Sequence, residues 1–283
     1  MIIKSHAKIN IVLNIKGRYN EHLHDIDIIS LPLELHDSLQ ISKINDSNSY
    51  VTFANIAIGG DDNNLATKAL CAFKKKYNID TNYRILINKT IPISAGLGGG
   101  SSNAAATLRG ISVLSKTRVS DEELAEIGFT LGSDVPFFIY GKPARIMGGG
   151  EIVKPITVKN TYYCLIVKPK TGLSTTMMYK KSDEFNLPTY NIDNVIKALE
   201  EGDDELLANN IGNVLEYPAI NELPEIETIK TRLKNEGFKI VLMSGSGSSV
   251  FALSTNKKHI KKVFKKLIKE NYKNTIELTK IIN

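Results

Sequence analysis

The segment from residue 92 to residue 106 constrains the fold of this chain most, because four glycines fall within five of its positions. Residues 83–87 before it have the pattern of a strand, and residues 101 to about 114 after it have that of a helix built from small side chains. Glycines let the backbone turn tightly and expose successive N–H groups. A helix N-terminus adds unsatisfied donors and a partial positive charge. The segment therefore predicts a phosphate-binding loop, in an enzyme that handles phosphate.

The spacing excludes the commoner glycine-rich loops. A P-loop ends in Gly-Lys-Ser or Gly-Lys-Thr, whereas Gly100 is followed by Ser101. A dinucleotide fingerprint starting at Gly96 needs Gly or Ala at position 101 and an acidic residue at a strand end, but residues 121–122 fall at a predicted helix start. A nucleophile elbow fails because Asn103 stands in place of its last glycine. A flexible surface turn is the remaining alternative, and the apolar residues on both sides of the loop disfavour it.

Composition places the chain among ordinary globular proteins. Its 283 residues are 42% hydrophobic, which suits two modest domains or one large one. No apolar run reaches membrane-spanning length, and the first motif begins too early to leave room for a signal peptide. Cys71 and Cys164 are too few for a disulfide framework or a zinc site. We therefore expect a cytoplasmic protein.

The net charge of +6 raises the question of nucleic-acid binding. Much of the charge comes from lysines between residues 257 and 269, among which apolar residues recur at helical spacing. This pattern predicts an amphipathic helix with a solvated lysine face rather than a nucleic-acid surface. Mild positive charge also suits attraction of nucleotides.

Strands and helices alternate along the chain in an α+β pattern. The sequence predicts strands at residues 9–15, 26–35, 83–87, 162–167, 241–243 and 250–253. It predicts helices at residues 65–77, 101–114, 122–131, 191–199, 204–216, 225–236 and 257–269. Ser120 and Glu123 form a capping box at the start of one helix, and Gly132 is expected to end it. A domain boundary is expected near residue 153, after three consecutive glycines.

The glycine-rich segment resembles the phosphate-binding motif of the GHMP kinases, Pro-x-x-x-Gly-Leu-Gly-Ser/Gly-Ser-Ser. Matches to the same superfamily occur at residues 7–10, 131–138 and 243–250, so the resemblance covers essentially the whole chain. It implies a two-domain GHMP kinase fold. The N-terminal, ATP-binding domain (residues 1–153) would be ribosomal S5 domain 2-like and the C-terminal domain (154–283) ferredoxin-like, with the active site in the interdomain cleft.

The Gly-Leu-Gly-Gly-Gly-Ser-Ser-Asn-Ala-Ala version resembles the family that phosphorylates 4-diphosphocytidyl-2-C-methyl-D-erythritol in non-mevalonate isoprenoid precursor biosynthesis. The resemblance implies transfer of the ATP γ-phosphate to the 2-hydroxyl of that sugar alcohol, with ATP and Mg²⁺ as cofactors. It implies no nucleic-acid or membrane partner, and a monomer or weak homodimer. Another GHMP kinase of the phosphomevalonate or homoserine type is the alternative. A non-catalytic nucleotide- or RNA-binding protein is a third reading.

The ATP site is expected to be built around the glycine loop. Its backbone N–H groups would hold the β- and γ-phosphates, and Ser101 or Ser102 could donate hydroxyls to them or to Mg²⁺. By resemblance Asn64 lies near the adenosine and Lys89 near the base or ribose, with a helix cap and a surface lysine as the ordinary alternatives. The residues assigned to ATP are Asn64, Lys89, Pro92, Gly96, Leu97, Gly98, Gly99, Gly100, Ser101, Ser102 and Asn103.

Asp134 and Lys8 are the expected catalytic pair. Asp134 follows a helix-ending glycine and precedes an apolar Val-Pro-Phe-Phe segment, where a carboxylate could accept the proton of the substrate hydroxyl. A turn-capping aspartate is the alternative. The role of Lys8, keeping Asp134 ionised and stabilising the developing alkoxide, rests on the resemblance. No ligands for a metal ion can be assigned.

The acceptor side departs from the family pattern. His24 matches the family histidine that is expected to contact cytosine, but Leu23 stands where the family has a stacking aromatic residue. Tyr179 matches the opposite aromatic residue, so half of the sandwich remains. A polar strand edge or loop is the alternative for this histidine. The residues assigned to the acceptor are Asn10, His24, Thr175, Tyr179, Gly245, Ser246 and Gly247.

Overall fold

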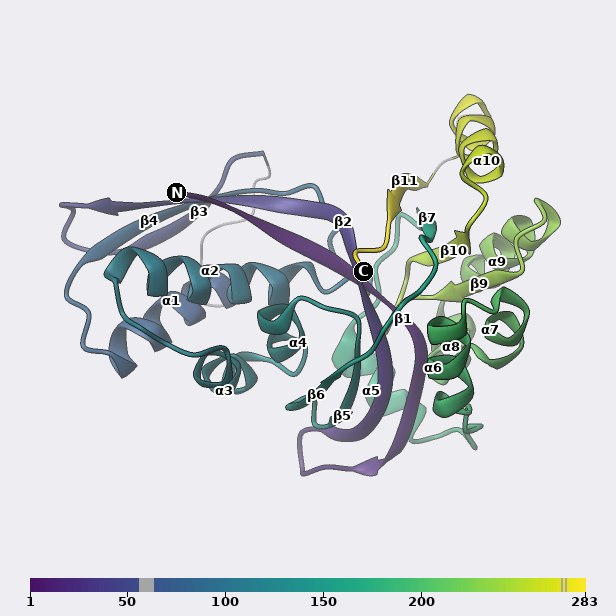
Figure 1. Ribbon diagram of the computed structural model, residues 1–283, viewed down its shortest axis with the longest axis horizontal. Helices are drawn as coiled ribbons and strands as arrows, with labels where there is room; N and C mark the ends of the chain where they lie inside the picture. Colours follow the sequence, from purple (N-terminus) through teal and green to yellow (C-terminus); the bar gives the residue numbers. More distant parts are fainter. Residues whose placement is uncertain (56–63, 271, 273) are drawn as a thin grey trace. The chain divides into compact units, whose positions relative to one another are not determined.

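A computed structural model describes residues 1–55, 64–270, 272 and 274–283 (Figure 1). The chain forms two compact units that interleave along the sequence. Unit 1 comprises Met1–Ala7, Leu35–Ile91 and Gly98–Gly141, and unit 2 comprises Lys8–Glu34, Pro92–Leu97 and Lys142–Asn283. The expected domain boundary at residue 153 lies within unit 2 and stays a prediction.

Two long strands, β1 (Ile2–Arg18) and β2 (His24–Ile44), each contribute to both units. They are longer than the predicted strands 9–15 and 26–35, and residues 38–44 of β2, beyond its predicted end, pair with a neighbouring strand. The glycine-rich segment is shared in the same way: residues 92–97 belong to unit 2 and residues from 98 onward to unit 1.

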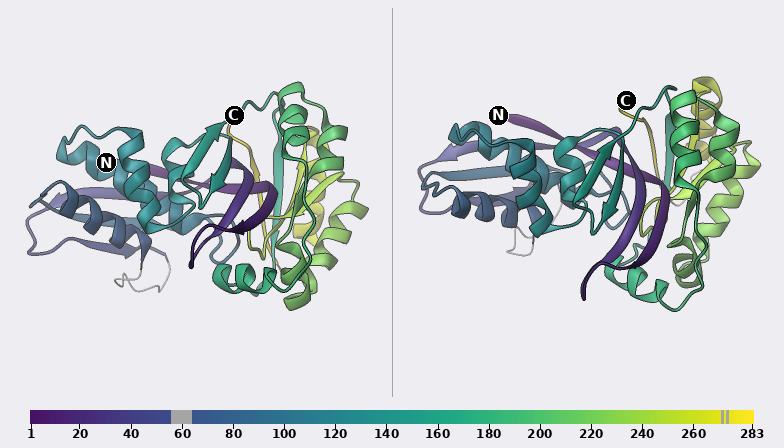
Figure 2. Two further views of the ribbon diagram at one scale, coloured as in Figure 1. Left: turned by 90° about the horizontal axis from the view of Figure 1, so that it is seen from below. Right: turned by 60° about the horizontal axis from the view of Figure 1, so that its bottom comes forward.

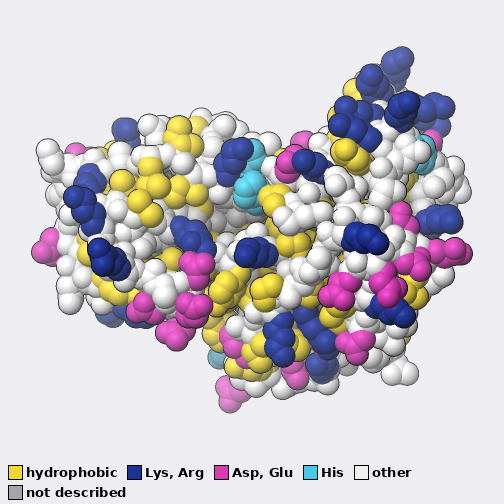
Figure 3. Space-filling view, viewed as in Figure 1, with side chains coloured by type: hydrophobic (Ala, Val, Ile, Leu, Met, Phe, Trp, Pro, Cys, Tyr) yellow, Lys and Arg dark blue, Asp and Glu magenta, His cyan; other side chains and the backbone are white. Residues whose placement is uncertain are grey.

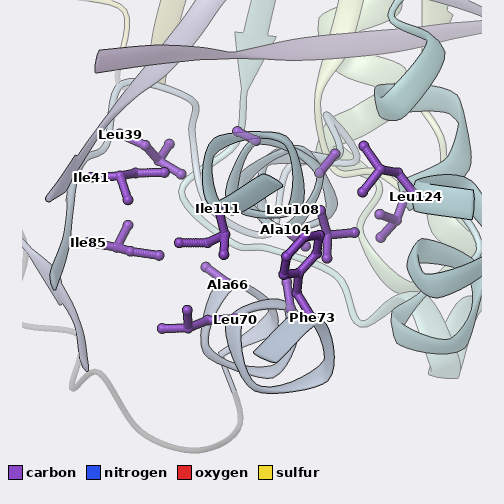
Figure 4. Packing of buried hydrophobic residues seen from close by; sticks show 14 of the residues in the cluster. Leu39, Ile41, Ala66, Leu70, Phe73, Ile85, Ala104, Leu108, Ile111 and Leu124 are labelled. Atoms are coloured by element: carbon purple, nitrogen blue, oxygen red, sulfur yellow. The ribbon is translucent and has the colours of Figure 1, made fainter. Parts of the chain in front are cut away.

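Unit 1 is a small sheet covered by helices. Strand β3 (Tyr50–Phe53) pairs in parallel with β4 (Asn82–Asn88), and β4 pairs antiparallel with residues 38–44 of β2. The helices are α1 (Leu65–Lys76), α2 (Gly99–Ser115), α3 (Asp121–Leu131) and α4 (Val135–Tyr140). Figure 4 shows side chains of α1 and α2 directed toward those of the sheet in one buried cluster.

Small residues on α2 allow this close packing. Ala104 and Gly110 lie on the buried side of the helix, and a Cβ at Gly110 would come within 2.3 Å of Ile41 Cδ1. A side chain at position 110 would therefore require the ends of the Ile41 and Ile3 side chains to move. The predicted capping box is confirmed: Glu123 N donates to Ser120 Oγ at 3.2 Å, and Ser120 N donates to the Glu123 carboxylate at 3.0 Å.

Unit 2 contains an antiparallel sheet of ferredoxin-like connectivity. Strands β7 (Tyr163–Lys168), β9 (Ile240–Met243), β10 (Val250–Ser254) and β11 (Thr275–Lys280) lie in the order β11-β7-β10-β9. Helices α9 (Glu225–Asn235) and α10 (Lys257–Lys269) connect the strands in a β-α-β-β-α-β sequence and pack against the sheet (Figure 2). The expectation of a ferredoxin-like C-terminal part is thus confirmed.

The described part of unit 2 contains seven further elements, three of which are strands of another sheet. They are β5 (Ala144–Gly148), β6 (Ile152–Pro155), α5 (Thr175–Ser182), α6 (Ile192–Glu201), α7 (Asp204–Asn210), β8 (Gly212–Asn213) and α8 (Glu216–Glu222). Residues 26–30 of β2 pair antiparallel with β5, and β1 pairs in parallel with β8. Lysines cover the outer side of α10 (Figure 3), as the predicted amphipathic helix requires. Among the described helices, none combines the length and apolar character needed to cross a membrane.

The prediction of one helix over residues 204–216 is wrong. Helix α7 ends at Asn210, and the chain then runs as strand β8 beside Val12 and Leu13 of β1. A Cβ at Gly212 would lie 2.1 Å from the ring of Tyr190, so this glycine is required by a tertiary contact. Pairing with a distant strand therefore overrides the local helical pattern.

Candidate functional site

The first turn of α2 presents a row of peptide donors within unit 1. Gly98 precedes the helix in the left-handed conformation, with φ 70° and ψ 16°, and supplies no side-chain cap. The first intrahelical bond runs from Ser102 N to Gly98 O at 2.9 Å. The amides of Gly99, Gly100 and Ser101 precede that bond, so they have no intrahelical acceptor. Three consecutive N–H groups and the positive end of a 17-residue helix thus meet at one place.

The next two side chains, Ser102 and Asn103, face inward. Ser5 Oγ donates to Ser102 Oγ at 2.7 Å, and Asn103 Nδ2 donates to Ser5 Oγ at 2.8 Å. Both residues are buried. Their side chains fix the helix, whereas the half-buried Ser101 hydroxyl lies 3.9 Å from the position of a Cβ on Gly132. The Ser101 hydroxyl therefore lies beside the turn between α3 and α4.

Asp134 lies at the start of α4 in that same turn. Its side chain makes no capping hydrogen bond, although the residue has the N-cap position with φ −84° and ψ −14°. The Asp134 side chain thus does not cap α4. Val135 and Phe137 are fully buried behind it, and Val135 packs so closely on Gly128 that a Cβ there would lie 2.7 Å from Val135 Cγ1. The half-buried carboxyl group is consequently held on a rigid support.

Asn64 and Lys89 have structural contacts of their own. Asn64 Oδ1 accepts a hydrogen bond from Ala66 N at 2.8 Å and caps α1. A helix cap was the alternative to the role of Asn64 near the adenosine. Lys89 Nζ donates to the carboxylate of Asp37 and, at 3.2 Å, to Asn103 Oδ1. Lys89 is therefore not a solvated surface lysine. Asp37 was not identified from the sequence, and nothing in its strand-like surroundings distinguishes it.

Lys8 and Asn10 form a buried pair in unit 2. Lys8 is only 5% exposed, and its Nζ donates to Asn10 Oδ1 at 2.5 Å. Asn10 Nδ2 in turn donates to Ser30 Oγ at 2.7 Å. The backbone N–H of Lys8 donates to Leu97 O at 3.1 Å, which ties this part of β1 to the glycine-rich segment.

The Ser/Gly loop, residues 244–247, lies against the same pair within unit 2. Ser244 Oγ donates to Gly96 O at 2.9 Å. A Cβ on Gly245 would lie 3.2 Å from Asn10 Oδ1 and 3.4 Å from Lys8 Nζ. A side chain at position 245 would thus crowd both polar groups, which explains the glycine there.

Hydrogen bonds on both sides support this loop. Thr175 Oγ1 and Ser246 Oγ lie 2.8 Å apart at its tip. Beneath it, Asn213 Nδ2 donates to Gly245 O at 2.7 Å, and Glu216 accepts from Met243 N at 2.8 Å. The sequence did not reveal Asn213 or Glu216, because the wrong helix at 204–216 included both.

His24 and Tyr179 pack together in unit 2. Their ring centroids lie 5.2 Å apart with the planes tilted by 34°. His24 Nε2 lies 2.9 Å from Asp183 Oδ1, and Arg18 forms an ion pair with the same carboxylate. Tyr179, the one aromatic residue of the predicted stacking pair that this chain retains, thus contacts the His24 ring. Asp183 and Arg18 were not identified from the sequence.

The predicted residues fall into two groups, each within one unit. Unit 1 contains Asn64, Lys89, Gly98, Gly99, Gly100, Ser101, Ser102, Asn103 and Asp134. Unit 2 contains Lys8, Asn10, His24, Pro92, Gly96, Leu97, Thr175, Tyr179, Gly245, Ser246 and Gly247. Residues assigned to ATP dominate the first group and residues assigned to the acceptor dominate the second.

A separate polar cavity of about 600 Å³ lies in unit 2. Asp27 on its wall accepts hydrogen bonds from Arg145 Nε and Nη2, both at 2.8 Å, and forms an ion pair with Lys16. None of the predicted site residues lines it. Across the described part of the chain, no group of three or more His, Cys, Asp or Glu side chains is arranged to hold a metal ion.

Comparison with known proteins identifies the family. The family model described as "GHMP kinases N terminal domain" matches residues 64–142, and the model described as "GHMP kinases C terminal" matches residues 195–274. A 4-diphosphocytidyl-2-C-methyl-D-erythritol kinase of Bacillus pumilus is 35% identical over 261 residues, covering 92% of this chain and 90% of the relative. The kinase of the same name from Bacillus cytotoxicus is 36% identical over 253 residues, covering 89% and 88%.

Solved structures agree. A crystal structure of 4-(cytidine 5'-diphospho)-2C-methyl-D-erythritol kinase covers 100% of both chains with a TM-score of 0.82 and 29% identity. A homoserine kinase from Cytophaga hutchinsonii, at 16% identity and a TM-score of 0.72, shares the fold. The chain belongs to the GHMP kinases, and within them to the family of 4-diphosphocytidyl-2-C-methyl-D-erythritol kinases.

Proposed function

We propose that this protein transfers the γ-phosphate of ATP to the 2-hydroxyl of 4-diphosphocytidyl-2-C-methyl-D-erythritol. The observation that carries the proposal is the alignment of about nine tenths of the chain with kinases named for this substrate. The alignments span 261 and 253 residues, so they extend far beyond the glycine loop.

ATP would bind with its β- and γ-phosphates at the first turn of α2. The amides of Gly99, Gly100 and Ser101 supply donors there without side chains that obstruct the approach. Mg²⁺ in kinases is bound largely through substrate phosphates and waters, with one or two protein oxygens. The Ser101 hydroxyl fits that donor set, and bound Mg²⁺ would neutralise phosphate charge.

Asp134 would act as the general base. Asp134 lies two residues beyond Gly132, which itself approaches Ser101, and its side chain does not cap α4. A carboxylate so placed can accept the proton of an attacking hydroxyl. Lys8 would stabilise negative charge on the acceptor oxygen, and Asn10 holds the Lys8 ammonium in a fixed direction.

His24 and Tyr179 would bind the cytosine end of the acceptor. His24 is buried and held by Asp183, so its ring has a fixed orientation. One observation favours a second candidate, a kinase of another small alcohol: Leu23 offers no aromatic face opposite Tyr179.

Turnover with a panel of acceptors tests the proposal. ADP release from ATP and Mg²⁺ is measured with 4-diphosphocytidyl-2-C-methyl-D-erythritol, phosphomevalonate, mevalonate and homoserine. We expect the cytidyl substrate to give the highest kcat/KM, and Asp134→Asn to abolish most of it. A higher kcat/KM with any other alcohol would support the second candidate instead.

A further inference from the structure

The carboxylate of Asp37 is completely buried and accepts hydrogen bonds from four donors within unit 1. Its Oδ1 accepts from Thr90 N at 2.7 Å and Ile91 N at 2.8 Å. Its Oδ2 accepts from Asn103 Nδ2 at 2.9 Å and from Lys89 Nζ. An ionised carboxylate is an acceptor only, with room for about four such bonds, so every site on Asp37 is used.

These four donors come from the two sides of the phosphate-binding turn. Thr90 and Ile91 belong to the chain that leaves β4, whereas Asn103 lies one turn into α2. Asn103 Nδ2 also donates to Ser5 Oγ, so its amide group is held on more than one side. Asp37 therefore fixes how α2 is rotated about its axis relative to β4, and that rotation sets where the amides of its first turn point.

Asp37 also fixes the direction of the Lys89 ammonium. That group lies 3.1 Å from the position of a Cβ on Gly99, the first residue of α2. Among the described residues, Asp37 and Asn103 account for two of its three N–H groups. The third is therefore available to an oxygen of a nucleotide bound at the start of the helix.

We propose that Asp37 is a positioning residue for the nucleotide: it aligns the first turn of α2 and directs the Lys89 ammonium toward the ligand. The inference rests on the proposed function in taking ATP as that ligand. It does not depend on which alcohol receives the phosphate. Asparagine cannot replace Asp37, because its NH₂ group would face either the two backbone amides or the Lys89 ammonium, and all of these are donors.

The test is ATP binding to Asp37→Asn, measured by calorimetry with ATP and Mg²⁺ in the absence of any acceptor. We expect the Kd for ATP to rise on the order of 10- to 100-fold, since the loss of one hydrogen bond to a charged group has an effect of this size. In turnover, the KM for ATP should rise while the KM for the acceptor stays within about twofold. The matched control is Asp27→Asn, which alters another buried carboxylate with basic partners and should leave ATP affinity unchanged.

A second comparison separates positioning from a loss of folding. Removing one partner of a buried ion pair is strongly destabilising, whereas the double variant Asp37→Asn/Lys89→Met leaves no unpaired buried charge. If Asp37 acts through Lys89, Asp37→Asn will weaken ATP binding by a smaller factor in the Lys89→Met protein than in the wild type. An unchanged Kd in Asp37→Asn would overturn the inference, and equal factors in both backgrounds would overturn the part of it that acts through Lys89. If the wild-type protein binds ATP but does not turn over the cytidyl substrate, that result would count against the proposed function alone.

Discussion

Replacing Gly96 with alanine is expected to disrupt the packing of residues 92–97 on the Ser/Gly loop in unit 2. Gly96 has φ 70°, in the left-handed region. A Cβ there would lie 2.0 Å from Ser244 O and 3.0 Å from both N and O of Gly247. These are backbone atoms, which cannot rotate away as the end of a side chain can. The methyl group therefore requires one of the two segments to move.

Two terms contribute to the cost, and a matched variant separates them. The left-handed conformation costs a non-glycine residue about 1–2 kcal/mol. Overpacking adds typically about 1–3 kcal/mol. Gly141 has a similar φ of 62°, but the nearest atom to its Cβ position is Phe138 O at 3.8 Å. Gly141→Ala therefore carries only the conformational term, and Gly96→Ala should be less stable than it by about 1–3 kcal/mol.

Equilibrium urea unfolding of both variants measures this difference, and steady-state turnover measures its functional consequence. Because Gly245 lies against Asn10 and Lys8, displacement of the Ser/Gly loop should lower kcat in Gly96→Ala but not in Gly141→Ala. Equal losses of unfolding free energy in the two variants would refute the reasoning, since they would show that the contact with Ser244 O imposes no cost.

Three further results are expected. Asp134→Asn should lower kcat on the order of 10²-fold with little change in ATP affinity, because it removes the proton acceptor; undiminished turnover by the folded variant would reject that role. Tyr179→Leu should raise the KM for the cytidyl acceptor by about 5- to 150-fold, if one stacking face contributes about 1–3 kcal/mol, and an unchanged KM would place the base elsewhere. Burial alone would raise the pKa of Asp27, but hydrogen bonds from Arg145 and Lys16 outweigh it and lower that pKa below its ordinary value. The carboxylate therefore stabilises the fold above its ordinary pKa of about 4, and this contribution is lost as the pH falls further. The difference in unfolding free energy between wild type and Asp27→Asn should shrink below pH 4, and a constant difference would contradict this assignment.

Local signals allowed much of the fold to be predicted from the sequence. The capping box joins Ser120 and Glu123, which are only three residues apart, so the sequence pattern alone predicts its hydrogen bonds. The lysine-bearing helix α10 was equally predictable, because helical periodicity alone separates its buried Ile260 and Val263 from its exposed face.

Long-range pairing explains the failures. The polar and apolar residues of 204–216 suit a helix, but β8 exists only because β1, some 200 residues earlier in the chain, offers an edge at Val12 and Leu13. Gly212 could not be used to predict the end of the helix, because it is required by contact with the ring of Tyr190, which the sequence does not show. A single sequence does not record which distant segment supplies such a partner.

The site shows the same division between motif residues and their supports. Motif spacing identified side chains and amides expected to contact ligands, because those chemistries need particular residue types at short separations. Asp37 contacts Lys89 and Asn103, which are 52 and 66 positions away, so no local spacing marks it. Lys89 itself had two readings, a nucleotide contact or a surface lysine. The structure adds a third, a lysine whose ammonium group is bound to the buried Asp37 carboxylate and therefore has a fixed direction. The chemistry of the glycine loop is thus visible in its own residues, whereas its orientation depends on a carboxylate that only the folded chain brings to it.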